Sequence, residues 1–218
     1  MIPSSCPLCG AEGRLLSEIP QGLRYHACPR CALVWLDPAM RLSAEAERAH
    51  YLTHENDPAD PRYRAFLGQL WQPLRERLPA GAHGLDYGSG PGPTLHRMAA
   101  EDGFPCAHYD PFFTPDPSCL DRTYAFVTCS ETAEHFHRPA REFARLGKLL
   151  QPGGWLGVMT ERLPAAASFP EWYYLRDPTH VCFYAEETFR WIAANFGFGE
   201  PEFPGPRVCL MQAAAGGR

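Results

Sequence analysis

The sequence contains no long apolar run and no excess of basic charge. No stretch approaches the ~18 or more consecutive apolar residues that a membrane span requires. The 218 residues carry a formal net charge of -5, which argues against a chain that holds nucleic acid through bulk electrostatic attraction. These absences exclude a membrane-spanning protein and disfavour a general nucleic-acid binder.

The start of the chain also lacks the basic residues and apolar segment of a secretory signal, because Met1 is followed by Ile2 and Pro3. The nine cysteines are an odd number, so we expect a cytoplasmic, reducing environment in which they serve as metal ligands or core residues rather than in disulfides. Hydrophobic residues make up 45% of the chain, which is enough for a core. The length suits one main domain with a small appendage, and we expect the two to have separate cores.

Four of the cysteines form two C-x2-C pairs, Cys6 with Cys9 and Cys28 with Cys31, separated by 18 residues. Each pair places two thiolates at one turn, and two pairs complete a tetrahedral site. The spacing predicts a structural zinc ion in a small ribbon over residues 1–37, with strands at 14–19 and 23–27. Sulfur would fill all four positions, which leaves none open for catalysis. Disulfides, unrelated buried cysteines or a rubredoxin-like iron site are the alternatives.

Residues 38–80 are interpreted as a linker with entry helices. Helices are predicted over residues 43–53 and 62–78, the second because apolar residues recur there at helical spacing. Tyr51 and Tyr63 either pack in the core or cover a ligand. The apolar run 32–36 is expected to pack the ribbon onto the main domain.

A strand, a glycine turn and a helix are predicted at the start of the main domain, residues 81–218. Leu85 leads into Asp86, and glycines follow at positions 88, 90 and 92 before a helix at 93–100. Glycine permits the backbone angles of such a turn and lets N–H groups approach a ligand. Asp110 ends the next predicted strand, at 105–109, where a carboxylate suits the hydroxyls of a ribose.

Strands and helices continue to alternate after that point. Strands are predicted at 124–129, 155–160 and 207–213, with helices at 138–150 and 187–194. Residues 152–154, Pro-Gly-Gly, are expected to end the first of these helices. The alternation predicts an α/β fold with a doubly wound, mostly parallel sheet.

The motifs resemble, in order, those of the class I S-adenosylmethionine-dependent methyltransferases. LDYGSGPG at 85–92 is similar to the first motif, and Asp110 occupies the place of the ribose-binding acid. FVTCSETAEHF at 126–136 resembles the fourth-strand motif, and LLQPGGWLGVMT at 149–160 the motif leading into the fifth strand. The resemblance covers residues 80–215. The segments CPLCG and CPRCALVWLDP are similar to the zinc ribbon that precedes some of these enzymes.

The resemblance implies a seven-stranded Rossmann-like sheet whose last strand is antiparallel. It implies S-adenosylmethionine as cofactor, with these cofactor-binding residues: Asp86, Gly88, Ser89, Gly90, Gly92, Asp110, Ser130 and Glu131. The sequence departs from the family in two places. The proline-rich segment 112–123 shortens the third-strand region and leaves the adenine contact unassigned, and Ala125 stands where an acidic residue is frequent.

Methyl transfer from a sulfonium depends mainly on positioning, and a base is needed only when the acceptor carries a proton. His180, after the turn at 177–179, is the predicted acceptor-side residue, as general base or orienting group. His135 competes for this role, and His137 lies in the same segment. Nearby aromatic residues form either a wall over the acceptor or a core beneath a loop: Phe169, Trp172, Tyr173, Tyr174, Phe183 and Tyr184.

The function predicted from these features is methyl transfer to a small-molecule acceptor. One alternative is an RNA methyltransferase that grips RNA with the ribbon, although only Arg14, Arg24 and Arg30 are basic there. Another is a non-catalytic, cofactor-binding scaffold whose ribbon docks a protein. A nicotinamide oxidoreductase is disfavoured, since G-x-G-x-G followed by Pro93 does not match G-x-G-x-x-G.

Overall fold

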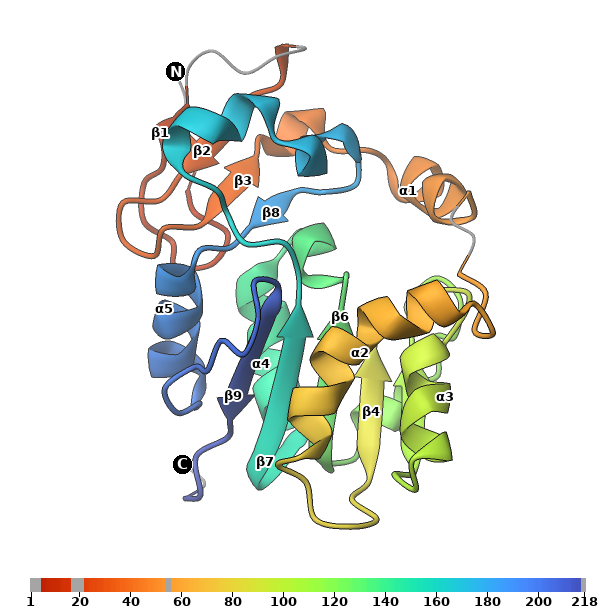
Figure 1. Ribbon diagram of the computed structural model, residues 1–218. Helices are drawn as coiled ribbons and strands as arrows, with labels where there is room; N and C mark the ends of the chain where they lie inside the picture. Colours follow the sequence, from red (N-terminus) through yellow and green to blue (C-terminus); the bar gives the residue numbers. More distant parts are fainter. Residues whose placement is uncertain (1–4, 17–21, 54–55, 217–218) are drawn as a thin grey trace.

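Figure 1 presents a computed structural model of the protein, which describes residues 5–16, 22–53 and 56–216. The strands are β1 (Arg14–Leu15), β2 (Tyr25–Ala27), β3 (Val34–Leu36), β4 (Gly84–Tyr87), β5 (Cys106–Tyr109), β6 (Tyr124–Ser130), β7 (Leu150–Met159), β8 (Cys182–Phe183) and β9 (Val208–Gln212). The α-helices are α1 (Ala44–Tyr51), α2 (Pro61–Arg75), α3 (Thr94–Glu101), α4 (Pro139–Lys148) and α5 (Glu186–Phe196). The predicted alternation of strands and helices from residue 84 onward is confirmed.

The larger sheet contains β5, β4, β6, β7 and β9 in that order. The first four strands are parallel, and β9 runs antiparallel to β7. The carboxyl ends of the parallel strands share one edge of the sheet, which is the upper edge in Figure 1. The loops that follow these strands therefore converge on one side of the molecule, where ligands bind in open α/β sheets.

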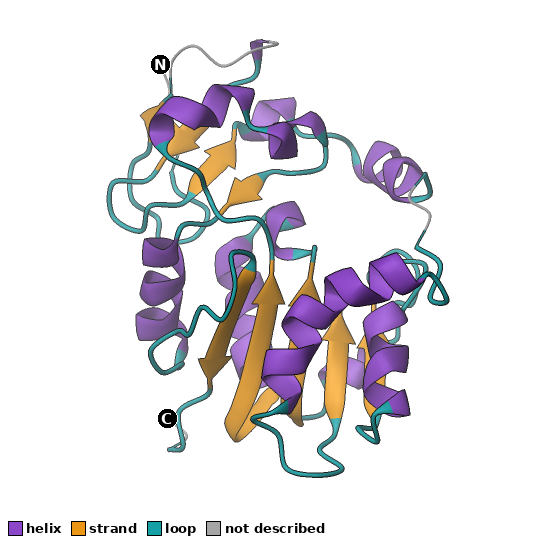
Figure 2. Ribbon diagram, viewed as in Figure 1, coloured by secondary structure: helices purple, strands orange, loops and turns teal. Residues whose placement is uncertain are grey.

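Helices cover both faces of this sheet (Figure 2). On one face, α2 and α3 enclose a cluster in which Trp71 packs against Phe126 of β6. On the other, Phe143 of α4 and Ile192 of α5 belong to a second, larger cluster. The arrangement confirms the doubly wound, mostly parallel α/β fold.

The larger sheet has five strands, so the seven-stranded expectation is wrong. Residues 112–123 contain only a short 3-10 helix, η3 (Pro117–Leu120), and no strand, which confirms the shortened third-strand region. In place of a sixth strand, two isolated bridges join Phe198 to Ala213 and Glu202 to Leu210. Prolines at positions 201, 204 and 206 lack the N–H group that a continuous ladder needs.

Strand β7 begins earlier than the sequence predicts. The preceding helix ends at Lys148, and the Pro-Gly-Gly segment expected to terminate it lies inside β7. Pairing with β6 starts at Leu150 and shifts register before Trp155. Gly153, at a φ of +76°, supplies the left-handed conformation that this irregularity requires.

A second, four-stranded sheet has the order β1-β2-β3-β8, entirely antiparallel. Its first three strands come from the predicted ribbon, and its fourth comes from residues 182–183, far along the chain. The apolar run that includes β3 is buried against β8, which confirms that this run packs the ribbon onto the main domain. The predicted strand at 14–19 is present at 14–15, and its residues 17–19 lie outside the described residues.

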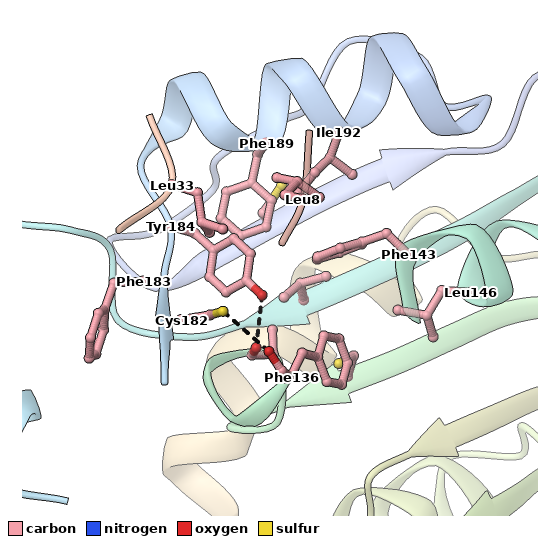
Figure 3. Close-up of a cluster of buried hydrophobic side chains, with 14 of the residues drawn as sticks. Leu8, Leu33, Phe136, Phe143, Leu146, Cys182, Phe183, Tyr184, Phe189 and Ile192 are labelled. Atoms are coloured by element: carbon pink, nitrogen blue, oxygen red, sulfur yellow. Dashed lines mark hydrogen bonds between the residues drawn. The ribbon is translucent and has the colours of Figure 1, made fainter. Parts of the chain in front are cut away.

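The ribbon and the main domain share one hydrophobic core, so the expectation of separate cores is wrong. Figure 3 shows Leu8 and Leu33 of the ribbon beside Phe189 and Ile192 of α5. In the same cluster, the Tyr184 hydroxyl donates a 2.8 Å hydrogen bond to the Ala133 carbonyl. Within the described ranges, no helix is long and apolar enough to cross a membrane.

Candidate active site

The glycine turn between β4 and α3 is held tightly at its base. The Gly88 N–H donates a 2.8 Å hydrogen bond to the carbonyl of Tyr109, at the end of β5. Gly88 has a φ of +77°, and a Cβ at this position would lie 2.2 Å from Cγ2 of Thr132. A Cβ on Gly92 would likewise lie 2.2 Å from the backbone oxygen of Asn56. Glycine is therefore required at both positions by close approach of neighbouring chain.

Asp110 lies at the tip of β5, directly against this turn. One carboxylate oxygen, Oδ2, accepts a 2.9 Å hydrogen bond from the Gly90 N–H. The other, Oδ1, accepts from the N–H groups of Phe112 and Phe113 at 2.8 and 3.1 Å. The backbone thereby fixes the orientation of the carboxylate, while Oδ2, which accepts only one of these bonds, retains a lone pair for a ligand hydroxyl.

Asp86 plays a bracing role in the observed structure. Its carboxylate is buried and accepts hydrogen bonds from the Thr128 hydroxyl at 2.9 Å and the His96 N–H at 3.3 Å. The second bond ties the first turn of α3 to the end of β4. Burial raises the pKa of Asp86 to about 6, against the opposing effect of these hydrogen bonds.

Two further predicted residues carry polar atoms without hydrogen-bond partners. The buried Oγ of Ser89 has none, and neither does Oε1 of Glu131. Glu131 adopts a φ of +46°, which is unusual for a residue with a side chain. Burial, with a smaller contribution from neighbouring Glu134, raises the pKa of Glu131 to about 8. Unsatisfied polar groups and backbone strain of this kind gather at ligand sites.

One cavity of about 600 Å³ unites these groups. A volume of this size lies within the range of small-molecule and cofactor sites. Its lining includes every predicted cofactor-binding and catalytic residue: Asp86, Gly88, Ser89, Gly90, Gly92, Asp110, Ser130, Glu131, His135 and His180. His137 also lies on its wall.

The two predicted catalytic histidines lie side by side in this cavity, with ring centroids 4.9 Å apart. Nδ1 of His135 is 3.0 Å from the carbonyl oxygen of Thr179, and Nδ1 of His180 is 2.8 Å from that of Tyr174. Burial lowers the pKa of His135. Nε2 of His180 lies 3.8 Å from the Asp177 carboxylate.

The entry helices also contribute to the cavity wall, which the sequence left undecided. Tyr51 and Glu47 of α1 and Tyr63 of α2 line it, and the Tyr51 hydroxyl donates a 2.7 Å hydrogen bond to Glu47. The Tyr51 ring meets that of His135 edge to face, at 5.2 Å. An aromatic residue at a helix end could have indicated this role, but core packing gives the same pattern.

The sequence assigned no role to Thr132, and it named Glu134 only as the neighbour of His135; both contribute to the site. The Thr132 hydroxyl donates to the Gly88 carbonyl at 3.0 Å, so it fastens the segment after β6 to the glycine turn. Glu134 is fully buried on the cavity wall. Both lie inside the fourth-strand motif, three residues or fewer from a residue that the sequence did single out.

The aromatic cluster around residues 169–184 does not line the cavity, so the wall interpretation is wrong. Phe169, Tyr174, Phe183 and Tyr184 are buried, and the rings of Phe169 and Phe183 pack on Tyr25 of the ribbon at 5.5 and 5.8 Å. Trp172 packs against the same cluster, and Tyr173 is exposed. These residues form the core beneath the loop, as the alternative interpretation holds.

The sequence of residues 59–199, about two thirds of the chain, matches a protein family described as a methyltransferase domain. The chain belongs to the methyltransferase domain family. With a glycine turn after the first central strand and an acid after the second, it is a class I, S-adenosylmethionine-dependent methyltransferase. No curated protein matches its sequence.

Solved structures share the fold of this methyltransferase at low identity. A chain from the complex between the Haloferax volcanii Trm112 methyltransferase activator and a methyltransferase has a TM-score of 0.52 at 14% identity, covering 72% of this chain and 96% of that one. CalO1, a methyltransferase in calicheamicin biosynthesis with SAH bound, has a TM-score of 0.51 at 12% identity, and the match covers 70% of this chain and 54% of CalO1. An O-methyltransferase family protein from Burkholderia thailandensis has a TM-score of 0.51 at 16% identity, and the match covers 73% of this chain and 62% of that protein.

The methyltransferase carries a second cluster of chemically reactive side chains in its ribbon. The four sulfur atoms of Cys6, Cys9, Cys28 and Cys31 lie within 4.8 Å of one another. The Cys6–Cys31 sulfur distance is 3.6 Å, and the Cys9–Cys28 distance is 3.3 Å. The hydrogen bond with Cys31 lowers the pKa of Cys6 to about 5, and burial raises that of Cys9 to about 11. All four are free thiols, so the predicted alternative of disulfides is wrong.

Proposed function

We propose that this methyltransferase transfers the methyl group of S-adenosylmethionine to a small-molecule acceptor that binds in the same cavity. The observation that carries the proposal is the continuity of the cavity. It joins the glycine turn and Asp110 at one end to His135 and His180 at the other. Cofactor and acceptor can thus meet in line, and such positioning accounts for ~7–11 kcal/mol of barrier lowering in comparable reactions.

At the cofactor end, Asp110 would accept hydrogen bonds from the ribose hydroxyls. The residues Gly88 to Gly92 would present backbone to the remainder of the cofactor. The Ser89 hydroxyl and Oε1 of Glu131, which lack hydrogen-bond partners, offer further polar contacts. The bound cofactor supplies a methyl group on a positively charged sulfur, which makes its thioether a good leaving group. Acidic residues in the wall suit that positive charge.

The charge of the cavity favours a small molecule over RNA as acceptor. Besides Glu131, whose pKa is raised to about 8, six acidic residues line it, against two arginines, Arg138 and Arg145. A wall of this kind repels phosphate groups, whose binding requires basic residues. One fold relative, CalO1, is a methyltransferase in calicheamicin biosynthesis, which agrees with a small-molecule substrate class.

His135 and His180 would face the acceptor. A carbonyl oxygen can only accept a hydrogen bond, so each Nδ1 in contact with a backbone carbonyl carries the hydrogen. Each Nε2 therefore bears a lone pair, which can hold or deprotonate an acceptor group. We assign the acceptor side to His180 first, with His135 as its neighbour.

The four-cysteine cluster would hold a structural zinc ion. Zn–S bonds of about 2.3 Å place the sulfurs of a tetrahedral site roughly 3.8 Å apart. The two sulfur distances in the structure, 3.6 and 3.3 Å, are close to this. A full set of sulfur ligands leaves no open position, so this ion would support the fold rather than the reaction.

Calorimetry with S-adenosylmethionine tests the proposed cofactor site. Asp110→Ala should weaken binding by roughly 1–3 kcal/mol, about 5- to 150-fold in Kd, because the ribose hydroxyls lose their acceptor. Asp121→Ala, at an exposed carboxylate outside the cavity, serves as the control with unchanged Kd. Equal affinity for wild type and Asp110→Ala would contradict the assignment, and tighter binding of a nicotinamide dinucleotide would restore the oxidoreductase alternative.

Once an acceptor has been identified, the His180→Ala variant should show lower turnover and an unchanged Kd for the cofactor.

A further inference from the structure

We infer that the acceptor end of the cavity is a second metal site, in which Glu134, His135 and His180 bind a divalent first-row transition-metal ion. Each of these residues offers one ligand atom, and the three atoms lie within 4.8 Å of one another. The site is separate from the four-cysteine cluster and uses nitrogen and oxygen ligands instead of sulfur. It rests on the proposed function only in placing the acceptor beside the ion. With the ion bound, the two Nε2 lone pairs are metal ligands, and the ion instead of a histidine base would contact the acceptor.

The tautomers of both histidines are set for metal binding. His135 donates its Nδ1 hydrogen to the Thr179 carbonyl and His180 donates its own to the Tyr174 carbonyl, which leaves the Nε2 atoms as bare lone pairs. Metal-bound histidines are oriented in this way, with the other ring nitrogen donating to a backbone carbonyl or a carboxylate. The loop that contains residues 174–180 thus supplies one ligand and the backbone acceptors for both rings.

Glu134 supplies the negative charge of the site. The side chain is fully buried, and Oε2 has no hydrogen-bond partner. Oε1 accepts a hydrogen bond from the Tyr174 hydroxyl, which fixes the carboxylate from behind as a supporting residue does at a metal ion. A buried carboxylate oxygen without a partner is costly, and a cation bound at Oε2 would remove that cost.

Two imidazoles and one carboxylate define the class of ion. Such a ligand set is found with Zn²⁺ and with Fe²⁺, and three protein ligands leave coordination positions open. Those positions would face the cavity, where an oxygen atom of the acceptor can bind. The Asp177 carboxylate, 3.8 Å from Nε2 of His180, is too distant for a hydrogen bond to this atom. It therefore leaves the lone pair accessible.

Elemental analysis after incubation with excess Zn²⁺ and desalting tests the inference. The wild-type chain should retain one more equivalent of zinc than His180→Ala or Glu134→Gln. Glu134→Gln keeps an oxygen that accepts from Tyr174 and removes only the charge, so it answers the question even where His180→Ala fails to fold. His137→Ala is the matched control, because His137 lines the same cavity, lies 3.6 Å from Glu47 and is outside the cluster. It should retain the wild-type zinc content.

Titration calorimetry with Zn²⁺ should show the same difference, with binding at this site at least tenfold weaker in Glu134→Gln. Equal zinc content in wild type, His180→Ala and Glu134→Gln would overturn the inference, as would a loss of the same equivalent in His137→Ala. Asp110→Ala separates this result from the proposed function, since it should lose cofactor affinity and retain both equivalents of zinc.

Discussion

Asp86 illustrates how a single buried carboxyl group links the sheet to the cavity. It accepts hydrogen bonds from Thr128 on β6 and from the first turn of α3. One side chain therefore ties β4 and α3, which flank the glycine turn, to the neighbouring strand β6. The hydrogen bonds favour the charged form, but burial disfavours it more strongly, and the pKa rises from 3.8 to about 6. The residue that aligns the turn is therefore also a source of pH-dependent stability.

The Asp86→Asn variant should remove a pH dependence from the free energy of unfolding. Because the folded-state pKa is raised, the folded chain binds the proton more tightly than the unfolded chain, and stability falls as pH rises from about 4 to about 6. The fall due to Asp86 should approach about 3 kcal/mol. Asparagine keeps an oxygen for the His96 N–H and cannot ionise. In urea unfolding, the stability of the variant relative to wild type should therefore improve by about 3 kcal/mol between pH 4 and pH 7.

Asp102→Asn provides the control for this measurement. A hydrogen bond from Trp71 lowers the pKa of Asp102, so its contribution is present above the unfolded-state pKa and is lost only as pH falls below about 4. The difference in stability between this variant and wild type should change little from pH 5 to pH 7. If Asp86→Asn behaved in the same way, burial would not be the dominant influence on Asp86.

At the scale of elements, the glycine turn between β4 and α3 depends both on its local sequence and on a tertiary contact. The positive φ of Gly88 is a local requirement of the strand-to-helix turn. The contact with Thr132 is a tertiary one, because that residue lies after β6. A β-carbon at position 88 would be strained at this positive φ, and it would also lie 2.2 Å from the methyl group of Thr132.

Gly88→Ala should destabilise the protein more than Gly81→Ala does. Gly81 has a similar φ of +71°, but a Cβ there would meet nothing within 4 Å, so its substitution measures the conformational cost alone, roughly 1–2 kcal/mol. Gly88→Ala should cost about 1–3 kcal/mol more, because the turn must move away from Thr132. Thermal or urea unfolding of the two variants gives the comparison, and equal costs would show that the turn relaxes freely.

The sequence was sufficient to predict those elements whose signal is local. Helix α2 follows from apolar spacing, β4 and its turn from the glycine pattern, and the cysteine cluster from two C-x2-C pairs. Strand β8 could not be predicted, since Cys182 and Phe183 form a strand only because β3, nearly 150 residues earlier, lies beside them. The proximity of Glu134 to His180 could not be predicted either, because it depends on the path of the loop that follows β7.

At the scale of the whole molecule, the ribbon and the main domain share one core and one sheet. Strand β8 completes the ribbon sheet, and the same segment continues into Tyr184, which bonds to the loop after β6. The ribbon thereby braces residues 174–184, including the cavity residue His180. We therefore expect the four-cysteine cluster to influence the active site, although it lies outside the cavity wall.

Cys28→Ser should therefore loosen the ribbon and the cavity together. The substitution removes one of the four clustered sulfurs, and the shared core carries the disturbance through β3 and β8 into the segment around His180. Hydrogen exchange followed by mass spectrometry should show reduced protection in both residues 25–36 and residues 174–184, with β4 less affected. Loss of protection confined to residues 5–36 would contradict a shared core. Cys119→Ser is the control, because Cys119 lies outside both the cluster and the cavity wall, and it should leave protection of both segments at the wild-type level.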